Sequence, residues 1–179
     1  SGTTTFNDMY FYPNQTAEAA VEMGIRANIG LVVMEFPTNY ASDPDDYLKK
    51  GLDFRDQWRG DGLISTSLAP HAPYTTSDKT LNTIGTYADQ LNMTIHTHLH
   101  ETKEEVENSI NQYKATPIQR YKSLGLLGPN LMAAHCTHVD ESDLNLLHQN
   151  NVNVVHNPSS NLILGSGIAD ISKMLDLGI

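Results

Sequence analysis

Short apolar runs of strand length alternate along the chain with segments that have helical periodicity. The strand-like runs are residues 3–10, 29–34, 63–69, 93–99, 131–134 and 152–155. The helix-like segments are residues 16–23, 44–58, 77–91, a stretch from 116 onward, 141–149 and 168–177. One strand and one helix in about every thirty residues predict right-handed βαβ units and a parallel sheet. The fold class is therefore α/β.

Several helix starts carry capping residues that side-chain chemistry favours. Asp43 precedes Pro44 and Thr116 precedes Pro117, whereas Ser77 precedes its helix without a following proline. An oxygen at the N-cap accepts a hydrogen bond from a free backbone N–H, and proline suits the first helical position. Thr16 is predicted to cap the first helix in the same way. The charged segment at residues 103–107 is not assigned to a helix.

Polar residues follow the predicted strands more often than the helices. His71 follows the third strand, Glu101 the fourth, His135 and His138 the fifth, and His156 the sixth. In parallel α/β folds, ligands and catalytic groups gather at the carboxyl ends of the strands. We therefore expect these side chains to meet at one rim. A single histidine at a strand end is more often a structural residue, and His148, inside a helix, is expected on the surface.

The run IHTHLHET at residues 95–102 concentrates three histidines and a glutamate. Because alternate strand residues face the same side, His96, His98 and His100 are predicted to project together, with Glu101 at the strand end. Imidazoles beside a carboxylate suit a metal that activates water. We expect one or two of the three histidines to act directly and the others to support loops.

Charge and cysteine content exclude several function classes. The formal net charge of −10 argues against nucleic-acid binding, which needs clustered lysine and arginine. The chain has neither a membrane-length apolar run nor a secretory signal, so we expect a cytoplasmic protein with no membrane partner. The lone Cys136 cannot form an intramolecular disulfide, fits a reducing compartment and leaves any metal site to His, Asp and Glu. A Cys136–His135 nucleophile pair is disfavoured because adjacent strand residues face opposite ways.

Four motifs in order carry a resemblance to a known family. They are APHAPY at 69–74, HLHET at 98–102, AAHCTH at 133–138 and HNPSSN at 156–161. Together they resemble the amidohydrolase superfamily, in the branch of methylthioadenosine/S-adenosylhomocysteine deaminases and triazine chlorohydrolases. Residues 1–10 are similar to the second barrel strand of that branch.

The resemblance implies a metal-dependent hydrolase with an incomplete (β/α)8 TIM barrel. Residues 1–179 would be one partial domain of about six βα units, covering strands 2 to 7. His98 would be a metal ligand, Glu101 the proton shuttle and a substrate contact, His135 the group that polarises the attacking water, and His71 a substrate-binding residue. One divalent metal is implied, with zinc favoured over iron. Residues 63–69 contain no lysine that could bridge two metals, which favours a mononuclear site.

The same resemblance implies that further metal ligands lie outside the chain. The family's His-x-His pair on strand 1 would precede it, and the aspartate of strand 8 would follow it. The full-length parent is expected to be a hydrolase acting on C–N bonds that deaminates a purine, adenosine-type or related small N-heterocycle. The 179-residue chain alone is expected to be inactive.

Other interpretations stay open at this point. One is hydrolytic dechlorination of a triazine-like ring, which uses nearly the same site. Another is a non-catalytic truncated barrel that associates through its open strand edges, and homo-oligomer formation is also left open. An open flavodoxin-type sheet is disfavoured because residues 10–14 (YFYPN) do not resemble a phosphate-binding loop.

Overall fold

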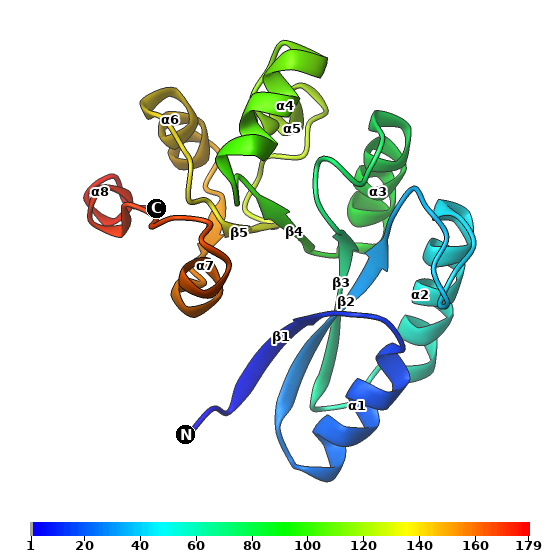
Figure 1. The fold of residues 1–179 in the computed structure, drawn as a ribbon. Helices are drawn as coiled ribbons and strands as arrows, with labels where there is room; N and C mark the ends of the chain where they lie inside the picture. Colours follow the sequence, from blue (N-terminus) through cyan, green and yellow to red (C-terminus); the bar gives the residue numbers. More distant parts are fainter. Residues whose placement is uncertain (1) are drawn as a thin grey trace.

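The computed structural model describes residues 2–179 and contains one curled, parallel sheet (Figure 1). Its six strands are β1 (Thr5–Met9), β2 (Arg26–Val33), β3 (Ile64–Pro70), β4 (Ile95–Leu99), β5 (Leu131–His135) and β6 (Asn153–Val155). Each strand pairs in parallel with the strand that precedes it in the sequence, so the sheet order is β1-β2-β3-β4-β5-β6. The predicted parallel sheet is confirmed.

Helices cover the outer face of the sheet, as a (β/α) barrel requires (Figure 1). They are α1 (Pro13–Glu22), α2 (Pro44–Trp58), α3 (Asp78–Leu91), α4 (Lys103–Tyr113), α5 (Pro117–Ser123), α6 (Glu141–Gln149), α7 (Pro158–Leu164) and α8 (Ile171–Asp176). In the described residues, β1 and β6 lie at the two ends of the sheet and do not pair with each other. The fold is therefore an incomplete barrel.

The predicted caps on three helices are confirmed. The side chain of Asp43 accepts a hydrogen bond from the backbone of α2, and Ser77 does the same for α3. Thr116 begins α5 with a full capping box, in which Gln119 accepts a hydrogen bond from the Thr116 backbone N–H at 3.0 Å. These starts could be predicted because each cap depends on side chains within a few residues of it.

Four helix predictions need correction. The first helix begins at Pro13, after Tyr12 with φ of 57°, so Thr16 lies inside the helix and does not cap it. Proline at the first position is already close to the helical φ and has no N–H to satisfy. The charged segment at residues 103–107 is the first half of α4. The helix α7 was not predicted, and the helix predicted over 168–177 is confined to Ile171–Asp176.

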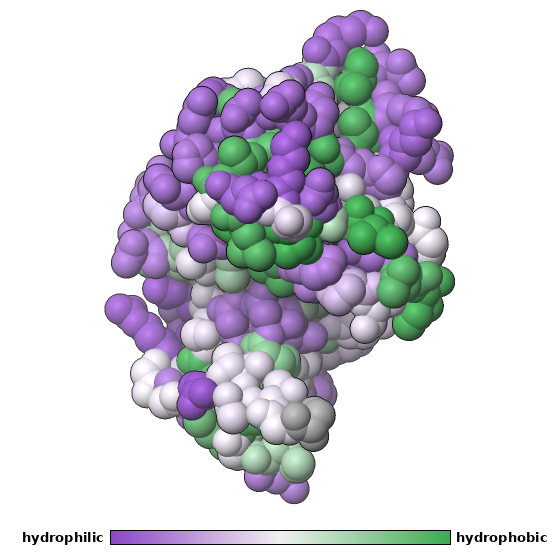
Figure 2. All heavy atoms as spheres, turned by 90° about the vertical axis from the view of Figure 1, so that its left-hand side faces the viewer, coloured by the Kyte–Doolittle hydropathy of each residue, from purple (hydrophilic) through white to green (hydrophobic). Residues whose placement is uncertain are grey.

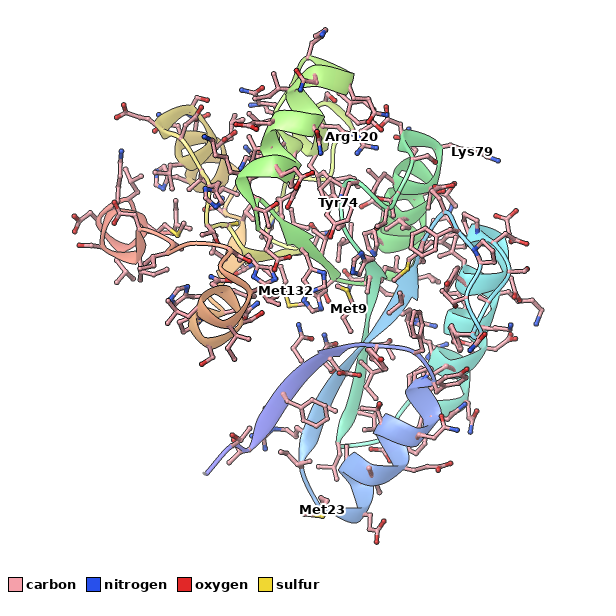
Figure 3. All side chains as sticks on the ribbon, in the orientation of Figure 1. Met9, Met23, Tyr74, Lys79, Arg120 and Met132 are labelled. Atoms are coloured by element: carbon pink, nitrogen blue, oxygen red, sulfur yellow. The ribbon has the colours of Figure 1, made fainter. Side chains whose placement is uncertain are left out.

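The apolar core lies between the sheet and the helices. The largest fully buried side chains there include Tyr47, Tyr121, Ile29, Leu31, Leu68, Leu81, Ile84, Ile95, Leu99 and Leu131. Burying each large aliphatic side chain contributes about 1.5–3 kcal/mol. Met9 and Met132, from strands near opposite ends of the sheet, both lie in the space that the sheet curls around (Figure 3).

The side of the molecule that carries α7 and α8 presents apolar side chains among polar ones (Figure 2). The exposed large hydrophobic residues on this segment are Leu162, Ile163, Leu164, Ile168 and Leu175. Across residues 2–179, none of the helices combines the length and the hydropathy that crossing a membrane demands.

Candidate functional site

Three histidines predicted to share a rim come together at the carboxyl ends of the central strands. His98 projects from β4, His71 follows β3, and His135 is the last residue of β5. The ring centroids lie 5.0 Å apart for His71 and His98 and 5.3 Å apart for His98 and His135. His96 lies one layer deeper on the same face of β4, with its ring centroid 6.1 Å from that of His98. His98 is therefore the centre of the cluster.

Glu101 and His135 form a carboxylate–imidazole pair beside His98. Glu101 Oε2 lies 3.7 Å from His135 Nε2, and Glu101 Oε1 accepts a hydrogen bond from Ser166 Oγ at 3.3 Å. His135 Nδ1 is 2.7 Å from Asn161 Oδ1, which can only accept, so this nitrogen carries the proton. The Nε2 atom that faces Glu101 is then free to accept a proton. The carboxylate and this nitrogen face one another at one point of the rim, slightly too far apart for a direct hydrogen bond.

His71 is held with one nitrogen free for a ligand. Its Nδ1 lies 3.1 Å from Thr75 Oγ1, and that hydroxyl donates its own proton to the carbonyl of Ala72 at 3.0 Å. His71 Nδ1 therefore donates, and Nε2 is left as an acceptor. Burial, reinforced by nearby His98, lowers the pKa of His71 to about 4, so the ring is neutral at pH 7. A neutral acceptor suits recognition of a hydroxyl or N–H group.

Burial also keeps the inner histidines neutral. It lowers the pKa of His96 to about 4 and lowers the pKa of His98, with the neighbouring rings adding to the effect. Metal ions bind the neutral form of imidazole, so this environment favours ligation over protonation. His98 therefore has the protonation state that the sequence-based hypothesis requires.

His100 does not share the face of His96 and His98, and that prediction was wrong. The strand ends at Leu99, and His100 adopts a left-handed backbone with φ of 54°. Its fully buried ring donates from Nδ1 to the carbonyl of His138 at 2.8 Å and accepts at Nε2 from the backbone N–H of Ile118 at 3.1 Å. Both ring nitrogens are occupied, so His100 is a structural residue.

The remaining histidines divide between support and surface. His138 Nε2 lies 2.5 Å from the carbonyl of Ser166 and so holds the loop that bonds Glu101. His148 is exposed on α6, as predicted. His156, expected at the rim, is exposed after β6.

A polar network below His96 was missed by sequence reasoning. Asn7 Nδ2 donates to His96 Nδ1 at 3.1 Å, and Asn28 Nδ2 bonds to both Asn7 Oδ1 and Ser67 Oγ. These residues come from β1, β2 and β3 and line the inner face of the sheet. Their signal was a polar residue in the middle of each of three otherwise strand-like segments, which indicates a partly polar barrel interior.

Asn161 and Ser166 were also missed, because they belong to a segment whose structure was not predicted. Asn161 is buried on α7, and its Nδ2 has no hydrogen-bond partner among the described residues. Ser166 precedes Gly167, whose φ is 111° and whose added Cβ would lie 3.0 Å from Thr137 Cγ2. Glycine there lets the loop approach closely enough for Ser166 to reach Glu101.

Arg120 fixes the loop that carries His71. It is buried on α5, and it donates to the carbonyls of Pro73 at 2.6 Å and Thr76 at 2.9 Å and to Asp78 Oδ1 at 2.7 Å. Tyr74 and Arg120 lie between α3 and α4 on the side where the strands end (Figure 3). A cavity of 310 Å³ opens between Tyr74 and α4, and Glu101 forms part of its wall.

The described residues do not complete a metal site by themselves. Within residues 2–179, no three His, Cys, Asp or Glu side chains are arranged to hold a metal ion. Zinc sites take at least three protein ligands. His98 has the right chemistry and protonation state for one of them, so the other donors would have to come from residues outside this range.

Comparison with known proteins gives the family. The model of the amidohydrolase family matches residues 1–179, the whole chain. The chain belongs to the amidohydrolase family. This agrees with the four motifs and with the incomplete barrel.

Individual relatives agree with that membership. The chain is 47% identical over 174 residues to a 5-methylthioadenosine/S-adenosylhomocysteine deaminase of Saccharophagus degradans, covering 97% of this chain and 39% of the relative. A zinc-bound adenosine deaminase from Xanthomonas campestris superposes with a TM-score of 0.96 at 41% identity, covering 99% of this chain and 40% of that one. An atrazine chlorohydrolase from Arthrobacter aurescens shares the fold, with a TM-score of 0.89 at 22% identity over 98% of this chain and 43% of its own. The chain thus spans about 40% of the length of the relatives it matches.

Proposed function

We propose that the protein is a metal-dependent deaminase that hydrolyses the exocyclic C–N bond of a purine, adenosine-type or related small N-heterocycle. The observation that carries the proposal is the Glu101–His135 pair, 3.7 Å apart, beside the half-buried neutral imidazole of His98. The names of the matched deaminases support the same reaction. The activity would require further metal ligands from outside the described residues.

Each site residue has a proposed role that its contacts permit. His98 would be one ligand of a divalent metal, with zinc favoured. A single ion is expected because β3 offers no lysine that could bridge two ions. A bound zinc ion would lower the pKa of a coordinated water toward neutrality. His71, with Nε2 free, would accept a hydrogen bond from the substrate, and Glu101 would contact the substrate as well as move protons.

The reaction requires one proton to move from the oxygen of the attacking water to the nitrogen of the leaving amino group. Water adds to the ring carbon that bears the amino group, the C–N bond breaks, and ammonia leaves. Glu101 would take the proton from the attacking water and deliver it to the departing nitrogen. His135 Nε2, facing Glu101, would polarise the attacking water by accepting a hydrogen bond from it, and it would stabilise the added oxygen only after taking up a proton, while Asn161 keeps its Nδ1 protonated.

We also propose that residues 1–179 form a single partial barrel domain and that the protein works in the reducing cytoplasm. The continuous sheet from β1 to β6 and the shared core support the first statement. The lone Cys136, fully buried, is consistent with the second.

The proposal is tested on the protein as its gene encodes it, with whatever precedes Ser1 and follows Ile179. Adenosine derivatives, guanine, cytosine and a chloro-triazine are supplied in turn, and ammonia, chloride and bound zinc are measured. Release of ammonia from a purine substrate supports the proposal. Release of chloride without ammonia from any substrate would show a chlorohydrolase instead.

Two variants and the isolated segment sharpen the test. Glu101→Gln should lower kcat by about 1,000-fold, within the usual range for losing a general acid–base group. Glu107→Gln makes the same charge change at an exposed position and should leave kcat unaltered. The 179-residue chain is assayed in parallel. Stoichiometric zinc with turnover there would overturn the view that further ligands are needed.

A further inference from the structure

A second carboxylate lies next to Glu101 and lines the same cavity. Glu105, on the first turn of α4, is 5% exposed and accepts two backbone hydrogen bonds. Its Oε1 accepts from the N–H of His100 at 2.8 Å, and its Oε2 accepts from the N–H of Glu101 at 2.9 Å. We infer that Glu105 is a positioning residue that fixes the orientation of Glu101 by binding these two successive N–H groups.

The turn that Glu105 holds has an unfavourable backbone. His100 has φ of 54°, a left-handed conformation that is unfavourable for a residue other than glycine. The His100 carbonyl accepts from the N–H groups of Thr137 at 2.9 Å and His138 at 3.1 Å. With both ring nitrogens also bonded, only its N–H needs a partner from the α4 side, and Glu105 supplies it.

The contact extends beyond ordinary helix capping. Thr102 is the N-cap of α4, and its side chain already accepts from the Glu105 N–H at 3.1 Å. In a capping box, the glutamate at this position would bond back to the N–H of the N-cap residue. The Thr102 N–H also acts on the Glu105 carboxylate and lowers its pKa, but the hydrogen bonds of Glu105 go to the two residues before the cap, so it stabilises the turn that precedes the helix as well.

The consequence for catalysis rests on the proposed deaminase function. Glu105 binds the backbone N–H of Glu101 and so fixes the start of the Glu101 side chain. The carboxylate oxygens of Glu101 lie 3.7 Å from His135 Nε2 and 3.3 Å from Ser166 Oγ. A displacement of about 1 Å in a reacting group can cost about 100-fold in rate. Releasing the turn would therefore reduce proton transfer while leaving the substrate contact of His71 in place.

The two N–H donors are each met by a different oxygen of the Glu105 side chain. A carboxylate provides both, whereas glutamine provides one oxygen and sets its NH2 group against the other N–H. Burial raises the pKa of Glu105 to about 7, so the group is held at a desolvation cost that a surface position would avoid. Glu105→Gln keeps the size of the side chain and removes this matched pairing.

The kinetic test uses the gene-encoded protein. In Glu105→Gln, kcat should fall by about 100-fold while KM rises by a much smaller factor, because the His71 contact to the substrate stays in place. The matched control, Glu107→Gln, alters an exposed residue of the same helix and should have no effect. In a Glu101→Gln background, adding Glu105→Gln should cause no further loss, because the group being positioned is already gone. An equal loss in both backgrounds would show a general structural effect and overturn the inference.

Amide hydrogen exchange tests the geometry without relying on catalysis. In Glu105→Gln, exchange of the His100 or Glu101 N–H should accelerate by about tenfold, the effect of losing one hydrogen bond. Unchanged protection of both amides would refute the inference that Glu105 holds these two N–H groups. If no deamination occurs with any substrate, the proposed function fails. The exchange rates still test whether Glu105 holds the two N–H groups.

A shorter carboxylate guards against a folding defect in the glutamine variant. Glu105→Asp keeps two acceptor oxygens but is one methylene too short to reach both N–H groups. It should give an intermediate kcat and intermediate exchange rates. Wild-type values in Glu105→Asp for both measurements would contradict the requirement for reach.

Discussion

Replacing Arg120 with methionine is expected to destabilise the protein by about 4 kcal/mol. The methionine keeps much of the apolar stem but leaves the carbonyls of Pro73 and Thr76 without their donor, and both residues are buried. An unpaired buried carbonyl costs about 1–3 kcal/mol, and two give the expected total. The Asp78 ion pair adds little, since the Asp78 side chain is 52% exposed and water replaces its partner.

The measurement is urea unfolding followed by circular dichroism, with Asp78→Asn and Arg120→Lys alongside. Asp78→Asn should cost less than about 1 kcal/mol, as exposed ion pairs do. Arg120→Lys should fall between the two, because one ammonium group cannot reach all the acceptors that the planar guanidinium reaches. If Asp78→Asn costs as much as Arg120→Met, the ion pair dominates and the reasoning from the carbonyls is wrong.

Three further predictions address stability, loop geometry and thiol reactivity. Glu105 has its pKa raised by burial from 4.5 to about 7, so the unfolded chain ionises first as pH rises. As pH rises from 4.5 to about 7, the free energy of unfolding of the wild type should therefore fall by about 3 kcal/mol relative to that of Glu105→Gln. A constant difference between the two proteins would contradict this. Gly167→Ala should destabilise by about 1–2 kcal/mol more than Gly60→Ala in thermal unfolding. Both glycines have positive φ, but only at Gly167 would the new Cβ crowd Thr137, and equal losses would exclude crowding. Cys136 is fully buried and burial raises the pKa of its thiol, so a thiol reagent should label it only after unfolding; rapid labelling of the native protein would show an open path to it.

The sheet could be predicted from sequence because its strands are short segments rich in β-forming residues, whereas two helices bury polar side chains. The buried residues of α4 are Glu105 and Ser109, and the buried residue of α7 is Asn161. An apolar stripe is the main sequence signal of a helix that packs on a core. Neither helix has that stripe, so hydrophobic periodicity missed α7 and did not recognise α4.

The candidate site was predictable in its membership more than in its geometry. Histidines placed after parallel strands indicated a shared rim, and His71, His98 and His135 do meet there. The alternation rule failed at His100 because the strand ends one residue earlier, in a left-handed turn. His135 also has positive φ, of 76°. Such conformations depend on hydrogen bonds from distant segments, which a local pattern does not contain.

The strictly sequential strand order has a consequence for synthesis on the ribosome. Each strand pairs with the one made just before it, so the sheet can grow as the chain emerges, and few long loops must close at once. The contact between Glu101 and Ser166 is an exception, because its partners are 65 positions apart in the sequence. The nascent chain therefore builds its scaffold early and completes the surroundings of Glu101 late. A stalled chain that ends before Ser166 would have most of the sheet without the finished site.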